Sequence, residues 1–195
     1  MKIETKAIIT LILGRIICAG FGPGIGVLYM TWAAAELGQL GLTIDNIAGT
    51  VGAAVIAALF GANAVIKLTA DRPYLTLAIL TIADWLDIAI LIMVGPIWPW
   101  AVIYSGAVRC SFDMAYILSR RVLINRAFSG DKLTKISAYL DTISAVTAAV
   151  GTGMTLMLEP TILNLAILSG VIAALLLPIQ YYQIKYLSAI AKENA

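Results

Sequence analysis

The chain has 195 residues, of which 61% are hydrophobic and only 12% are charged, and its mean hydropathy is +0.95. A soluble domain carries about 25% charged residues, so this composition excludes a cytosolic enzyme, a nucleic-acid-binding protein and a disordered chain. The net charge of +2 is too small to indicate an acidic partner, and the absence of histidine removes histidine-based zinc, haem and proton-relay chemistry. We therefore expect an all-α integral membrane protein without a cofactor.

The apolar stretches predict six transmembrane helices in a single domain, 1–195, because a membrane-spanning helix needs about 20 residues. In chain order the predicted spans are 7–30, 47–68, 75–94, 97–118, 136–158 and 163–182. Arg15 interrupts the first stretch and its apolar pattern continues to Trp32, so we expect a retained span rather than a signal peptide.

The basic residues predict the orientation of these spans. All Lys and Arg residues except Arg15 and Arg109 lie in the N-terminus, the 2–3 connection, the 4–5 connection and the C-terminus. The other three connections carry no Lys or Arg, and their only charges are those of Glu36, Asp45 and Glu159. Because basic residues concentrate on the cytoplasmic side of a membrane protein, we expect both termini to be cytoplasmic. The expected location is the bacterial cytoplasmic (inner) membrane, with membrane lipid around the helices.

Besides Lys67, which borders the 2–3 connection, six charged residues fall within the predicted spans. Each costs several kcal/mol there unless it is paired, neutralised or in contact with water. They are Arg15, Asp84, Asp87, Arg109, Asp113 and Asp141. Arg109 and Asp113 are four residues apart and can pair within one helix. Four acids against two arginines leave two acids without a basic partner, and such groups can exchange protons in a proton-coupled transporter. Alternatively, the ion pairs only fix how the helices pack, and the shallower acids extend towards the membrane surface.

Small residues recur on three of the predicted spans. In the first span four glycines surround Pro23 between Gly20 and Gly26, which predicts either a broken helix or close helix packing. The fifth span repeats Ala145, Ala149 and Gly153 at every fourth position. The second span does the same with Gly49, Ala53, Ala57 and Gly61. Such faces allow close approach of helices, either within one chain or between two copies.

Two segments together resemble the major facilitator superfamily. Glu36-Leu37-Gly38 precedes the small-residue span, and Ala70-Asp71-Arg72 follows it, as in the family's loop between spans 2 and 3. Ser119-Arg120-Arg121 and Asp131-Lys132-Leu133 are similar to the 4–5 region of its drug and siderophore exporters. The loop motif departs from the family because Lys67 stands where it normally opens with glycine, and Gly151-Thr152 replaces a Gly-Pro pair.

The resemblance implies a specific architecture and function. Asp71, Arg72, Arg120 and Arg121 would form a cytoplasmic loop motif, spans 1 and 4 would line a central cavity, and span 3 would be peripheral. The superfamily has 12 spans in two parallel halves. This chain supplies one half, so we expect a homodimer in which spans 2 and 5 meet the other copy. The expected function is proton-coupled export of a small amphipathic compound or peptide.

Two other functions are open from the sequence. The first is a non-transporting membrane immunity or accessory protein that binds a partner within the bilayer. The second is a membrane enzyme, because Asp84-Trp85-Leu86-Asp87 begins like the metal-binding pattern of lipid-headgroup transferases. Ile88 stands in place of the next glycine of that pattern, and its later acidic pair is missing, so we expect no enzyme activity.

Overall fold

The computed structural model describes residues 2–39, 41, 43–69 and 72–194, and its elements are six α-helices. They are α1 (Ile3–Gly38), α2 (Ile44–Thr69), α3 (Pro73–Met93), α4 (Pro99–Ala127), α5 (Gly130–Thr155) and α6 (Ile162–Glu193). Within the described part of the chain there is no strand. The predicted all-α class is therefore confirmed.

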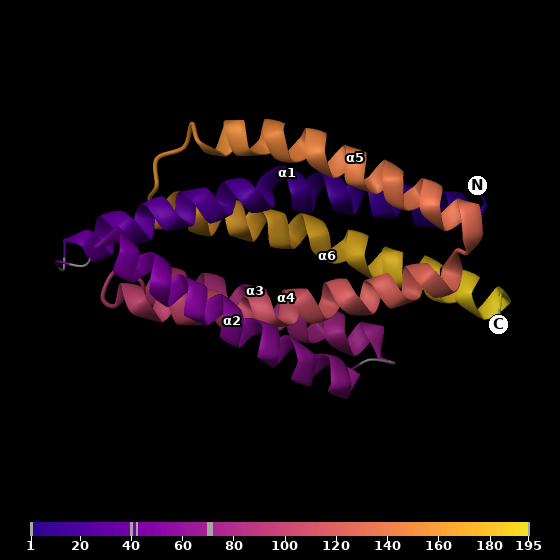
Figure 1. The fold of residues 1–195 in the computed structure, drawn as a ribbon, viewed down its shortest axis with the longest axis horizontal. Helices are drawn as coiled ribbons and strands as arrows, with labels where there is room; N and C mark the ends of the chain where they lie inside the picture. The colour runs from indigo at the N-terminus through magenta and orange to yellow at the C-terminus, as the bar shows by residue number, and fades with distance from the viewer. Residues whose placement is uncertain (1, 40, 42, 70–71, 195) are drawn as a thin grey trace.

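The helices pack as two groups of three, with both chain termini at the same end of the bundle (Figure 1). α1 packs mainly against α5 and α6, and α4 packs mainly against α2 and α3. α3 and α6 also contact each other, which joins the two groups. If α1, α2 and α3 are matched with α4, α5 and α6 in that order, each main contact has a counterpart. The α1–α5 contact corresponds to the α2–α4 contact, and the α1–α6 contact corresponds to the α3–α4 contact. The main contacts are therefore matched between the first three helices and the last three, although among the described residues the contact between α4 and α6 has no comparable counterpart between α1 and α3.

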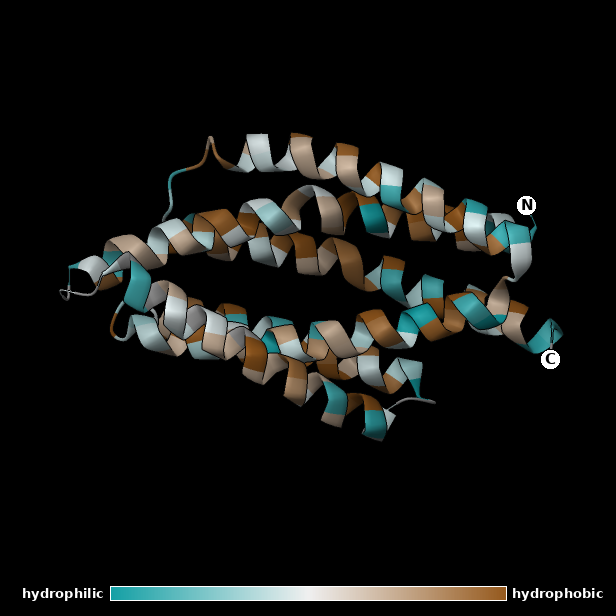
Figure 2. Cartoon of the chain, viewed as in Figure 1, coloured by the Kyte–Doolittle hydropathy of each residue, from teal (hydrophilic) through white to brown (hydrophobic). Residues whose placement is uncertain are grey.

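Four helices are long and apolar enough to cross a membrane: α1, α3, α6 and the Ala48–Lys67 part of α2. α4 and α5 are not among them, because their residues are on average less apolar than those of the other four helices. Hydrophilic residues gather at the end of the bundle that holds the termini (Figure 2). The fold is thus compatible with a membrane protein.

The connection between spans 4 and 5 is shorter than predicted. α4 continues to Ala127 and α5 begins at Gly130, so only Phe128 and Ser129 separate them. Gly130 has a φ of 57°, a left-handed value that glycine adopts without strain and that allows the sharp reversal. Residues 119–127 were expected in a loop because the sequence is charged there. Their helical conformation places Arg120 and Arg121 on the last turns of α4.

Around Pro23, Gly20 and Gly24 of α1 pack closely against α5, whereas a Cβ added to Gly22 or Gly26 would meet nothing within 4 Å. α1 is continuous through Pro23, so the predicted broken helix is wrong. A Cβ added to Gly151 of α5 would overlap the backbone of Gly20, and one added to Gly24 would overlap the side chain of Thr155. The predicted close packing is therefore present, and it joins α1 to α5.

The buried core consists of two clusters, one towards each end of the bundle. The cluster at the end with the termini includes Leu11, Tyr116 and Leu187. The cluster at the opposite end includes Trp32 and Leu165. Charged residues from the predicted spans, such as Asp84 and Arg109, lie between these two clusters.

Candidate functional site: a cavity with two unpaired acids

A cavity of about 470 Å³ lies between α1, α3, α4 and α6, with one residue from α2. Its lining is mostly apolar and small, but it also contains three of the predicted charged residues, Asp87, Arg109 and Asp113. The remaining lining residues that carry polar or reactive groups are Cys18, Tyr29, Cys110 and Ser169. A mostly apolar cavity with a few converging polar groups is the usual form of a small-molecule site.

The arginine in this cavity is bound to a neighbouring helix. Arg109 Nε of α4 donates a hydrogen bond to Asp84 Oδ1 of α3 at 2.5 Å, and the pair is only partly exposed. The sequence allowed Arg109 to pair with Asp113 one turn further along α4, and the structure instead pairs it with Asp84 of α3. An arginine that precedes its acid by four residues has the less favourable order along a helix, and α3 supplies an acid at the right height.

Two acids of the cavity are left without an arginine. Asp87 accepts a hydrogen bond from Ser105 Oγ at 2.5 Å. Among the described residues, no basic side chain forms an ion pair with Asp87 or Asp113. This matches the prediction that two acids would lack a basic partner. Asp87 lines the cavity even though its helix, α3, was expected to be peripheral, because α3 packs directly against α4.

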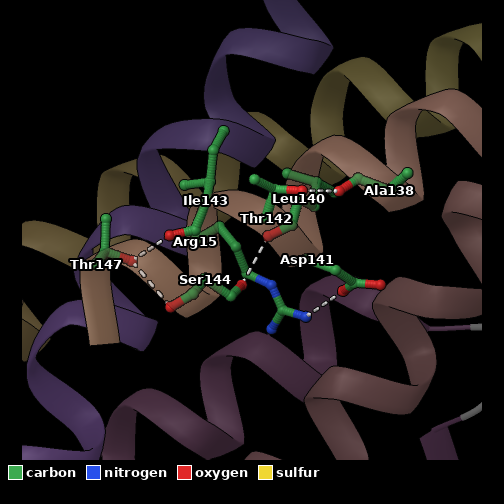
Figure 3. Close-up of polar contacts among 8 residues, drawn as sticks. All are labelled: Arg15, Ala138, Leu140, Asp141, Thr142, Ile143, Ser144 and Thr147. Carbon is green, nitrogen blue, oxygen red and sulfur yellow. Dashed lines mark hydrogen bonds and ion pairs between the residues drawn. The ribbon is translucent and has the colours of Figure 1, made fainter. Parts of the chain in front are cut away.

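The remaining two of the six charged residues, Arg15 and Asp141, do not line the cavity. Figure 3 shows their side chains facing each other. Arg15 of α1 reaches Asp141 of α5 with 3.6 Å between Nη2 and Oδ1, and the Asp141 side chain is 75% exposed. Neighbouring hydroxyl groups on α5, such as those of Ser144 and Thr147, bond to carbonyl groups of their own helix. The six charged residues thus separate into a cavity group and an α1–α5 pair.

Sequence reasoning missed several residues of the cavity. Cys18 and Cys110 lie in apolar stretches of the sequence and were not among the predicted site residues, although both are free thiols that line the cavity. Tyr29 was not considered, and its buried hydroxyl has no hydrogen-bond partner among the described residues. One sequence signal was available for Ser105, because it precedes Arg109 by one helical turn and therefore shares its face.

The predicted loop motif divides in the structure. Asp71 lies outside the described residues. Arg72 immediately precedes α3, and its backbone N–H donates to the Thr69 carbonyl at 2.8 Å. Arg120 has its guanidinium carbon 5.9 Å from the centre of the Tyr116 ring, so it points back along α4 into the bundle. Arg121 is exposed.

The two small-residue faces are largely uncovered. On α2, Gly61 packs against Ser111 of α4, with 2.9 Å between its ideal Cβ position and the hydroxyl oxygen. The remaining small residues of the two faces are exposed in the single chain. They are Gly49, Ala53 and Ala57 of α2 and Ala145, Ala149 and Gly153 of α5. These faces are free to receive another helix.

The comparisons with known proteins add no identity. A scan of protein-family models, a search of curated proteins and a search of solved structures each find no match to this chain. The cavity and its acids are therefore the observations from which a function can be inferred.

Proposed function

We propose that this chain is a half-size secondary transporter that works as a homodimer and moves a small amphipathic compound or peptide by proton coupling. The observation that carries this proposal is the cavity in which Asp87 and Asp113 lack an arginine partner. A carboxyl group in such a setting gains stability when it takes up a proton, because burial penalises its charged form. Proton uptake and substrate binding would then act on the same space.

The arrangement of the helices supports two copies as the working unit. Both termini lie at one end of the bundle (Figure 1), so a second copy related by an axis along the bundle can stand parallel to the first. Two copies would bring together 12 helices and would allow the uncovered face of α2 in one copy to meet the uncovered face of α5 in the other. Small residues on both faces permit close approach.

The membrane arrangement belongs to the same proposal. All six helices would span a bacterial cytoplasmic membrane, with α4 and α5 covered on their charged sides by neighbouring helices and by the second copy. Both termini would face the cytoplasm, because the basic residues concentrate at that end of the bundle. An intramembrane acid is by default a functional-site hypothesis, and here two acids face one cavity.

A reconstituted transport assay tests this proposal. Purified protein in lipid vesicles would carry rhodamine 6G, a small amphipathic dye, in response to an imposed pH gradient. We expect Asp87→Asn and Asp113→Asn each to abolish the dependence on the gradient. Asp131→Asn, in the exposed first turn of α5, is the matched control and should behave as wild type.

The opposite outcome would remove the proposal. If proton movement neither accompanies nor alters the movement of amphipathic dyes or peptides, the chain is not a proton-coupled transporter. Intact binding of a membrane partner in the Asp87→Asn and Asp113→Asn variants, without transport by the wild type, would instead favour the immunity or accessory function.

A further inference from the structure

A second space, outside the cavity, runs along the surface between α3 and α4. It is a groove of about 750 Å³ with an almost entirely apolar lining. Along α3 it extends from Ile79 to Val94, which corresponds to about 22 Å of helix. One leaflet of a bilayer is about 15 Å of hydrocarbon, so the groove runs deeper than one leaflet. Large apolar side chains on its rim, such as Ile82 and Val108, are exposed.

The groove and the cavity share a wall. Asp87 and Arg109 line both spaces. The groove also contains Ser105, whose hydroxyl donates to Asp87, while Arg109 is held by Asp84. At this point two side-chain hydrogen bonds between α3 and α4 help to close the wall. Such bonds can be exchanged by rotation of side chains, without separating the helices.

The wall lies towards the end of the bundle opposite the termini. Asp87 is six residues before the end of α3, and Ser105 is six residues after the start of α4. Both are therefore about 9 Å from that end of their helices. Trp98, at the tip of the groove, has the amphipathic ring that commonly marks a membrane–water interface.

We propose that the α3–α4 groove is a lateral passage through which an amphipathic substrate exchanges between the cavity and the bilayer leaflet opposite the termini. The Asp87–Ser105 and Asp84–Arg109 hydrogen bonds form the gate of this passage. This inference rests on the proposed transport function, since it names the route to the same cavity.

The chemistry of the two spaces indicates the occupant. A flexible hydrocarbon part fits the groove, because its lining offers almost no polar surface. A polar end that donates hydrogen bonds fits the wall, because Asp87 has a hydroxyl partner but no arginine of its own. A molecule with both parts can lie along the groove and exchange its polar end for Ser105 at the carboxylate.

The native thiol Cys110 provides the test, because it lines the cavity but not the groove. The full chain with Cys18→Ser is placed in phosphatidylethanolamine–phosphatidylglycerol vesicles. The rate of Cys110 modification is measured with hexadecyl methanethiosulfonate, which dissolves in the bilayer, and with a charged, water-soluble methanethiosulfonate. Ala101→Trp fills the groove from α4, and Ala174→Trp is a control on an exposed site of α6 outside both spaces.

We expect Ala101→Trp to slow the bilayer-soluble reagent about tenfold, which corresponds to about 1.4 kcal/mol of added barrier. The water-soluble rate and the Ala174→Trp control should not change. Ser105→Ala, which removes one hydrogen bond of the gate, should accelerate the bilayer-soluble reagent. Ala83→Trp fills the groove from α3 and repeats the test if Ala101→Trp does not fold.

Equal rates in the Ala101→Trp or Ala83→Trp variant and in the unblocked protein would overturn the passage, because Cys110 would then be reached by another route. These rates require no substrate movement. A failure of the lateral passage is therefore distinguishable from a failure of the transport function, which the vesicle assay with the dye measures separately.

Discussion

Gly151 of α5 contacts the backbone of Gly20 of α1, whereas Gly153, two residues further along α5, faces open space. Substitution by alanine should therefore destabilise the protein much more at position 151 than at position 153. A Cβ at position 151 would overlap the carbonyl oxygen, carbonyl carbon and Cα of Gly20, whereas one at Gly153 meets nothing within 4 Å. Gly151→Ala and Gly153→Ala gain the same helix propensity, about 1 kcal/mol. Overpacking costs typically about 1–3 kcal/mol. Because backbone atoms cannot rotate away, we expect the upper end of that range at position 151.

The two variants should therefore differ by about 3 kcal/mol in the free energy of unfolding, or about a hundredfold in the unfolding equilibrium constant. The measurement is a titration of sodium dodecyl sulfate into protein in mild detergent, followed by tryptophan fluorescence. Trp32, which is buried on α1, reports the loss of packing around that helix. If Gly151→Ala is as stable as Gly153→Ala, the backbones of α1 and α5 do not touch at this point.

Three further predictions concern polar contacts. Gln183→Leu should cost about 1–3 kcal/mol of unfolding free energy in the same titration, because the amide is fully buried and bonds to two other helices; stability equal to wild type would contradict those bonds. In a double-mutant cycle, the losses of unfolding free energy caused by Asp84→Asn and Arg109→Gln should depart from additivity by about 0.5–3 kcal/mol, because the two side chains form an ion pair. Additive losses would show that the pair does not form. Glu4→Gln should cost at most about 1 kcal/mol, because its 2.7 Å pair with Lys132 is exposed, and raised salt should remove the difference.

The helices were largely predictable because long apolar stretches have few alternatives to helix formation. The end of α4 was not, because residues 119–127 are charged, and charge was interpreted as a sign of a loop. In the structure this segment is a helix that keeps its apolar side, including Leu123 and Ala127, in the core.

The cavity was predictable in kind but not in its partners. The excess of acids over arginines follows from counting residues, so two unpaired acids were expected. The acid that pairs with Arg109 is determined by the relative position of α3 and α4 along the bundle axis. No local pattern in a single sequence encodes that position. For the same reason the contact of Gly20 with Gly151 could not be anticipated, although glycine spacing indicated close packing somewhere on each helix.

The number of copies in a lipid bilayer tests the proposed half-size transporter most directly. The protein is labelled with one fluorophore per chain and placed in phosphatidylethanolamine–phosphatidylglycerol vesicles. The number of photobleaching steps of a single particle then gives the number of copies in it. The proposal predicts two steps in most fully labelled particles. It also predicts fewer pairs in Ala149→Trp than in the control Ala174→Trp, which changes an exposed residue of α6. One step per particle at every protein-to-lipid ratio would contradict it, because a single copy leaves the faces of α2 and α5 uncovered.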